Sequence, residues 1–140
     1  QKELYDRVDD AVCAVRSALE EGILPGAGKA LLDESADLFT YSAASQEYDA
    51  ALRILKDALM SPFQQILANA GLKPSDVYKD STPIGHGYNL KTGQMGDLIE
   101  MGVIDPLKVT RSALQNAVSV AVTILSTNAI ITMARTYEQQ

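Results

Sequence analysis

A periodic apolar stripe at the start of the chain is the feature that most constrains its fold. Apolar residues recur there at spacings of three and four, and they are Leu4, Val8, Val12, Val15 and Leu19. This spacing places the side chains on one face of an α-helix. Gly22 follows the stripe, and glycine commonly ends helices because it adopts positive φ at little cost. The pattern therefore predicts a long amphipathic helix that ends at Gly22.

Further helices are predicted along most of the chain, at residues 29–39, 46–60, 61–71, 73–79 and 105–126, with a brief helical turn at 97–102. Two of these starts carry a polar residue followed by proline, Ser61-Pro62 and Asp105-Pro106. Such pairs are typical of an N-cap followed by proline in the first helical position. Residues 40–45 are predicted to form a loop and residues 88–90 a short strand. The fold class predicted is mainly α.

Residues 129–133 read as a strand because they are apolar and partly β-branched. No segment beside them offers a hairpin partner, and an unpaired strand is not stable alone. We therefore expect this strand to pair with one supplied from outside the chain.

Composition excludes several function classes. The net charge of −6 argues against a nucleic-acid binder, and no apolar run is long enough to span a membrane. The single cysteine, Cys13, excludes an internal disulfide and a multi-cysteine metal site. We expect it to be a buried, inert thiol, and His86, between two glycines, to be a surface-loop residue.

Three blocks of sequence carry a family likeness. They are RVDDA at 7–11 running to EEGILPGAG at 20–28, then GYN at 87–89 with MGVIDP at 101–106, and KVTRSALQNA at 108–117. In this order and at these intervals they resemble a GroEL-type group I chaperonin, its C-terminal part only. The resemblance covers residues 1 to about 133 of the 140.

This resemblance implies a domain organisation. Residues 1–21 would be the helix that ends the intermediate domain, residues 22–135 the C-terminal half of the equatorial ATP-binding domain with a short β element, and residues 136–140 a tail. The family's phosphate-binding Gly-Asp-Gly-Thr-Thr-Thr loop and its apical domain do not occur in this sequence.

The implied function is a part in ATP-dependent protein folding, within an ATPase of the isomerase class. The cofactors would be ATP and Mg²⁺, the metal held mainly by the N-terminal half, so that this chain alone is expected to be inactive. The implied partners are identical subunits in a ring, and a co-chaperonin and unfolded clients bound through the apical domain, with no nucleic acid and no membrane. The location would be the cytoplasm, or alternatively an organelle matrix.

Asp10 is the catalytic residue that the resemblance implies. The matching carboxylate in the family positions the water that attacks the γ-phosphate, and such alignment is a large part of phosphoryl-transfer catalysis. The alternative from the sequence alone is a solvated aspartate on a helix face.

Gly26, Ala27 and Gly28 would form a turn whose backbone lies against the ribose and purine of ATP. The alternative is a simple turn between helices. The family usually has a third glycine where Ala27 stands, and the alanine methyl is expected to be tolerable only if φ is negative.

Asn89 would contact the base, with Leu90 and Lys91 beside it where the family often has two alanines. The alternative for Asn89 is a turn-forming asparagine at a strand end. Val103 would pack against the purine or belong to the core. Asp105 would accept hydrogen bonds from the ribose hydroxyls, and could also cap the following helix.

The sequence also leaves a second function open. In it, the chain is a non-catalytic helical module that binds other chaperonin subunits.

Overall fold

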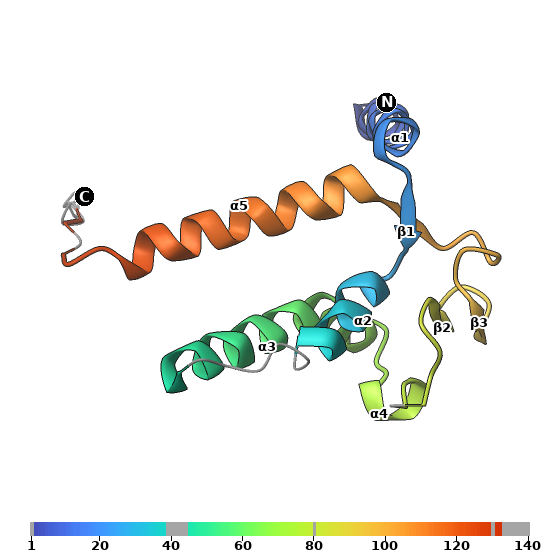
Figure 1. Ribbon diagram of the computed structural model, residues 1–140. Coiled ribbons are helices and arrows are strands. Elements are labelled where there is room, and N and C mark those ends of the chain that lie inside the picture. The colour runs from blue at the N-terminus through green and yellow to red at the C-terminus, as the bar shows by residue number, and fades with distance from the viewer. Residues whose placement is uncertain (1, 39–44, 80, 130, 133–140) are drawn as a thin grey trace, which may run out of the picture.

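The computed structural model describes residues 2–38, 45–79, 81–129 and 131–132. Its helices are α1 (Lys2–Glu21), α2 (Lys29–Asp37), α3 (Gln46–Asn69), α4 (Pro74–Val77) and α5 (Leu107–Leu125). Its strands are β1 (Ile23–Pro25), β2 (His86–Asn89), β3 (Gln94–Asp97) and β4 (Ile104–Pro106). The prediction of a mainly helical chain with a short β element is confirmed (Figure 1).

A two-stranded ribbon joins the end of α1 to the start of α5. β1 pairs antiparallel with β4, and Leu24 lies opposite Asp105. α1 leads into β1 and β4 leads into α5, so α1 and α5 diverge from this ribbon (Figure 1). The backbone N–H of Leu107 donates to the carbonyl of Gly22 at 3.1 Å, which ties the start of α5 to the end of α1.

The main apolar core lies between α2 and α3, which run side by side below the ribbon (Figure 1). Leu32 of α2 meets Phe63 and Leu67 of α3, and all three are buried. The ring of Tyr78, just after α4, meets Phe63 edge to face at 5.8 Å between centroids. Tyr78, in the segment that follows α4, therefore covers one end of this core.

The predicted helix boundary at Ser61-Pro62 is wrong, because α3 runs unbroken through Pro62. Proline lacks an N–H and so removes one helical hydrogen bond. The buried residues Leu59, Phe63 and Leu67 lie four apart on both sides of Pro62 and face the same core. Packing against α2 thus outweighs the local stop signal. The helix begins where Ser45 accepts a hydrogen bond from the N–H of Tyr48 at 3.3 Å.

β2 and β3 form a hairpin in which Gly87 lies opposite Gly96. The strand expected at 88–90 is present, shifted to His86–Asn89. The brief helical turn expected at 97–102 is a series of turns after β3 and not a regular helix, although the N–H of Met101 donates to the carbonyl of Asp97 at 3.0 Å, as in one turn of an α-helix. The carboxylate of Asp97 accepts the N–H groups of Ile99 at 2.8 Å and Glu100 at 3.0 Å, as an N-cap does, and the turn ends at Gly102, whose φ is 71°.

α4 and α5 match the helices expected at 73–79 and 105–126, with later starts and earlier ends. Asp105 does not begin α5, since it belongs to β4 and the residue before the helix is Pro106.

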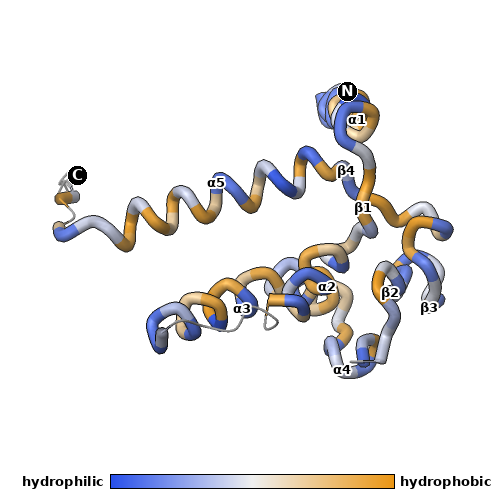
Figure 2. The backbone as a smooth tube through the Cα atoms, viewed as in Figure 1, coloured by the Kyte–Doolittle hydropathy of each residue, from blue (hydrophilic) through white to orange (hydrophobic). Residues whose placement is uncertain are grey.

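The apolar stripe of α1 is exposed along its whole length, from Val12 at 54% to Leu19 at 83%. Cys13 is exposed as well, so the prediction of a buried thiol is wrong. α1 contacts β4 and α5, and its less exposed residues lie mainly toward its C-terminal end, so no other element within the described residues covers the stripe (Figure 1). Apolar residues also run along α5, where Leu125 is 86% exposed (Figure 2). No helix within the described residues is long and apolar enough to cross a membrane.

The strand predicted at 129–133 lies partly outside the described residues, which omit 130 and 133. Ala129, Ile131 and Thr132 lie in neither helix nor strand, and Ile131 is 98% exposed. Its pairing with an outside strand therefore stays a prediction. The loop at 40–44 and the tail at 136–140 also lie outside the described residues.

Candidate functional site

The glycine turn, residues 26–28, lies against the residue that precedes β4. The N–H of Gly26 donates to the carbonyl of Val103 at 2.9 Å, which extends the ribbon by one contact. Gly26 is buried, and a Cβ there would lie 3.1 Å from the backbone of Val103 and Ile104. Any larger residue here would therefore push the two backbones apart by a few tenths of an ångström. The structure thus brings two of the sequence-predicted segments together, the glycine turn and Val103.

Ala27 adopts a φ of 57°, so the expectation of a negative φ at this position is wrong. The left-handed conformation is imposed by the turn, which closes through the N–H of Lys29 on the carbonyl of Gly26 at 3.0 Å. Gly28 also has positive φ, 71°, and a Cβ there would lie 2.7 Å from the backbone nitrogen of Phe63. The turn is therefore strained at Ala27 and packed directly on α3 at Gly28.

Asp105 lies on β4 opposite Leu24 of β1, and only Pro25 separates Leu24 from the glycine turn. It is half-buried, and burial raises the pKa of its carboxyl above the ordinary value. Among the described residues it has no hydrogen bond to the N–H groups of α5, so the alternative of a helix cap is not supported. Within the described residues no side-chain partner is found for it, which leaves its oxygens free to accept hydrogen bonds from a ligand.

Asn89 lies at the end of β2 and is 9% exposed. Its side-chain oxygen accepts the N–H groups of Lys91 at 3.0 Å and Thr92 at 3.3 Å. This is the turn-forming use that the sequence left open as the alternative. The oxygen is thus occupied by the hairpin, and the amide NH₂ is the group that remains to donate to a ligand. Leu90 and Lys91 are exposed in the turn beyond it.

The hairpin is connected to the ribbon through Leu98, which is 1% exposed. Its N–H donates to Gly85 at 3.1 Å, and its carbonyl accepts from Val103 at 2.8 Å. A Cβ on Gly87 would lie 2.8 Å from the Leu98 side chain, so the hairpin packs tightly on it. Asn89 is therefore held in the same unit as Val103 and the glycine turn.

Asp10 is not brought to this group in the single chain. It is exposed in the middle of α1, and the helical rise of about 1.5 Å per residue puts it about 18 Å along the axis from Gly22. The C-terminal end of α1 is fixed by an ion pair between Glu20 and Lys108 of α5. Gly22, with a φ of 95°, connects the helix to β1.

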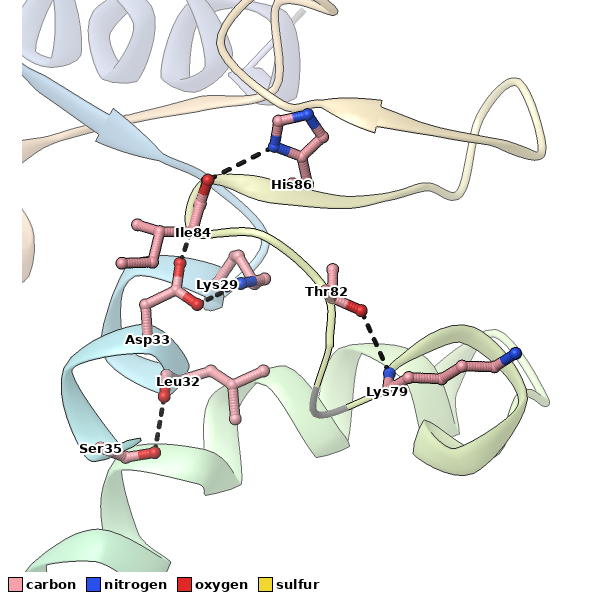
Figure 3. Close-up of polar contacts among 9 residues, drawn as sticks. Lys29, Leu32, Asp33, Ser35, Lys79, Thr82, Ile84 and His86 are labelled. Carbon is pink, nitrogen blue, oxygen red and sulfur yellow. Dashed lines mark hydrogen bonds and ion pairs between the residues drawn. The ribbon is translucent and has the colours of Figure 1, made fainter. Parts of the chain in front are cut away.

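Lys29 and Asp33 are polar residues of the site that the sequence reading did not identify. Lys29, the first residue of α2, is fully buried and forms an ion pair with Asp33 one helical turn later (Figure 3). Its ammonium lies 5.4 Å from the centre of the Tyr78 ring. The second Asp33 oxygen accepts the N–H of Gly85 at 3.0 Å (Figure 3). The sequence shows only that Lys29 and Asp33 are oppositely charged and four residues apart, a spacing that usually indicates a solvent-exposed pair on a helix surface.

His86 is half-buried in β2, so the prediction of a surface-loop residue is wrong, and its ring contacts the carbonyl of Ile84 through Nδ1 at 3.3 Å (Figure 3). Among the described residues no group of three His, Cys, Asp or Glu side chains could hold a metal ion. A shallow apolar hollow lies on α1, not at the glycine turn, and it is lined by Arg7, Val8, Ala11, Val12 and Val15.

Comparison with known families agrees with this architecture. The family model described as the TCP-1/cpn60 chaperonin family matches residues 1–135 of the chain.

Proposed function

This chain belongs to the TCP-1/cpn60 chaperonin family, and from that membership we propose that it supplies the adenosine side of the ATP site of a protein-folding chaperonin. One observation carries the proposal. The bond between Gly26 and Val103 places the glycine turn beside β4, which presents the half-buried carboxylate of Asp105.

The residues present suit a nucleoside. The glycine turn offers backbone without bulky side chains, Val103 an apolar surface for a purine, and Asp105 an acceptor for ribose hydroxyls. The NH₂ group of Asn89 is a donor for the acceptor nitrogens of a base. Leu90 and Lys91, exposed in the turn that follows Asn89, would border the base.

Hydrolysis requires more than these residues supply. The described residues contain no cluster that could hold Mg²⁺, and we propose that the metal and the phosphates are held mainly by the N-terminal half of the equatorial domain. Asp10 would then orient the attacking water once α1 closes over the nucleotide. Positioning of this kind is what phosphoryl transfer chiefly needs from a protein.

We also propose the domain division implied by the sequence, with residues 1–21 in the intermediate domain and residues 22–135 in the equatorial domain. Its support is the joint at Gly22, where α1 leaves the ribbon with a positive φ. A helix attached at one end can change its direction more readily than one packed along its length.

The second candidate function is an assembly module that binds other chaperonin subunits without turnover. The exposed apolar residues of α5 favour it, among them Val120 at 59%, Val122 at 59% and Ile124 at 57%. Apolar surface of this kind commonly marks a contact with another protein. The two functions are compatible, because a ring subunit needs both a nucleotide site and neighbours.

An NMR titration of the chain with ATP tests the proposed function. We expect the amide signals of Gly26, Gly28 and Asn89 to shift, and Asp105→Ala to raise the Kd about tenfold, the loss typical of a hydrogen bond to a charged group. Glu100→Ala removes an exposed carboxylate five residues earlier and should leave the Kd unchanged. Absence of any shift at millimolar ATP, together with association seen by light scattering, would favour the assembly module alone.

A further inference from the structure

Lys29 has an unusual environment for a lysine. It is fully buried, although a buried ammonium loses several kcal/mol of hydration unless it is paired. It also stands at the start of α2, where the helix dipole disfavours a positive charge. The positive charge of Lys29 therefore needs nearby groups that replace its lost hydration. The carboxylate of Asp33 and the face of the Tyr78 ring are these groups.

Asp33 does more than neutralise Lys29. Its second oxygen reaches across the chain to the N–H of Gly85, 52 residues away in sequence, at 3.0 Å. Gly85 directly precedes β2, the strand that ends at Asn89. A single carboxylate therefore joins the helix that follows the glycine turn to the strand that carries Asn89.

These contacts close a ring through the proposed site, and its members are Gly26, Val103, Leu98, Gly85, Asp33 and Lys29. The backbone part runs from Gly26 to Val103, Leu98 and Gly85 through three hydrogen bonds of 2.8 to 3.1 Å. The side-chain part runs from Gly85 through Asp33 to Lys29, whose own N–H returns to the carbonyl of Gly26 at 3.0 Å. Asp33 is the one member that joins the ring through its side chain at two points.

We propose that Lys29 and Asp33 are positioning residues of the nucleotide site, fixing the glycine turn relative to the hairpin that carries Asn89. The proposal rests on the proposed function. Neither side chain touches the nucleotide, since Lys29 is fully buried and Asp33 is engaged at both oxygens. Their effect is on the distance between two parts of the site.

The test separates positioning from stability. Asp33→Ala leaves Lys29 buried without its counter-charge, so it should lower the urea midpoint of unfolding and also raise the Kd for ATP about tenfold. Lys29→Met combined with Asp33→Ala removes the uncompensated charge and keeps a side chain of similar length. We expect this double variant to recover most of the urea midpoint but to keep the raised Kd, because the bond to Gly85 is still absent.

The outcomes are distinct. A double variant whose Kd returns to the wild-type value along with its stability would overturn the positioning role and leave the proposed function intact. A wild-type chain that binds no ATP would overturn both. Glu34→Ala removes the exposed neighbouring carboxylate of α2 and should change neither measurement. Should Asp33→Ala fail to fold, the double variant by itself carries the test.

Discussion

Arg111 of α5 donates two hydrogen bonds to the carboxylate of Glu21, the last residue of α1, from Nη2 at 2.7 Å and from Nε at 3.0 Å. Paired bonds of this kind fix direction as well as distance. The last two residues of α1, Glu20 and Glu21, carry negative charge at the end of the helix where the helix dipole is also negative, which is unfavourable. Lys108 and Arg111 of α5 compensate them, so the end of α1 is held by side chains that lie 88 and 90 residues away in the sequence.

The first prediction is that Arg111→Ala broadens the range of directions that α1 samples. Spin labels on the exposed Cys13 and on a cysteine introduced at Ser119 would report the separation of α1 and α5. We expect a wider distance distribution in Arg111→Ala and an intermediate one in Arg111→Lys, which cannot form the paired bonds. Arg16→Ala on α1 is the control. Identical distributions in all variants would show that the ribbon alone fixes α1.

The same contact has a defined pH dependence. The hydrogen bond from Arg111 lowers the pKa of Glu21 below the ordinary value of 4.5. A lowered pKa means that the contact is fully present above the ordinary value and is lost as pH falls through the lowered one. We therefore expect the distance distribution to be constant above about pH 5 and to broaden only in more acidic solution. Broadening near neutral pH would contradict this assignment.

The second prediction concerns Ala27, whose φ is 57°. A left-handed conformation destabilises alanine by roughly 1–2 kcal/mol, and glycine does not carry this penalty. Glycine offsets part of the gain, because it makes the unfolded chain more flexible and so favours unfolding. We expect Ala27→Gly to raise the free energy of unfolding by about 1 kcal/mol. Ala30→Gly, inside α2, should lower it by about 0.5–1 kcal/mol. Urea unfolding compares the two, and a destabilised Ala27→Gly would show that the alanine methyl makes a contact worth more than the strain.

The third prediction separates backbone strain from steric overlap at two glycines. Gly28 and Gly71 have similar φ values, 71° and 74°, but only at Gly28 would a Cβ meet another atom, the nitrogen of Phe63 at 2.7 Å. Gly71→Ala should cost roughly 1–2 kcal/mol, the left-handed penalty alone. Gly28→Ala should cost roughly 1–3 kcal/mol more, because α2 must move away from α3. Equal losses of stability would mean that the two helices separate without cost.

Local patterns in the sequence predicted the helices well where periodicity extended over many turns, as in α1 and α5. They were wrong at Pro62, because the stop signal of a proline is local while the packing of Leu59, Phe63 and Leu67 on α2 is not. They were also wrong at Cys13, because the periodic face of α1 has no partner within the described residues that would cover it.

In the site, too, some contacts follow from the sequence and others depend on tertiary packing. Gly26 lies against Val103, while the shared nucleotide site that the family resemblance implies for them stays a prediction. The ion pair of Lys29 and Asp33 was not predicted, because a lysine and an aspartate four residues apart in a helix normally lie in solvent. Only the folded chain, with Tyr78 over the lysine and Gly85 beside the aspartate, makes this pair buried.

The last prediction concerns the catalytic role proposed for Asp10. It requires an assembly that also contains the phosphate-binding half of the equatorial domain, since the chain alone is expected to hydrolyse no ATP. In that assembly Asp10→Ala should lower kcat on the order of 10²-fold, the loss typical of one acid–base group. The Kd for ATP should stay unchanged, because orienting water matters in the transition state and little in the ground state. Asp9→Ala, on the neighbouring exposed residue of α1, is the matched control and should retain kcat. An equal loss in both variants, or a parallel loss of affinity in Asp10→Ala, would indicate that the acidic face of α1 acts through charge or stability rather than through one carboxylate at the γ-phosphate.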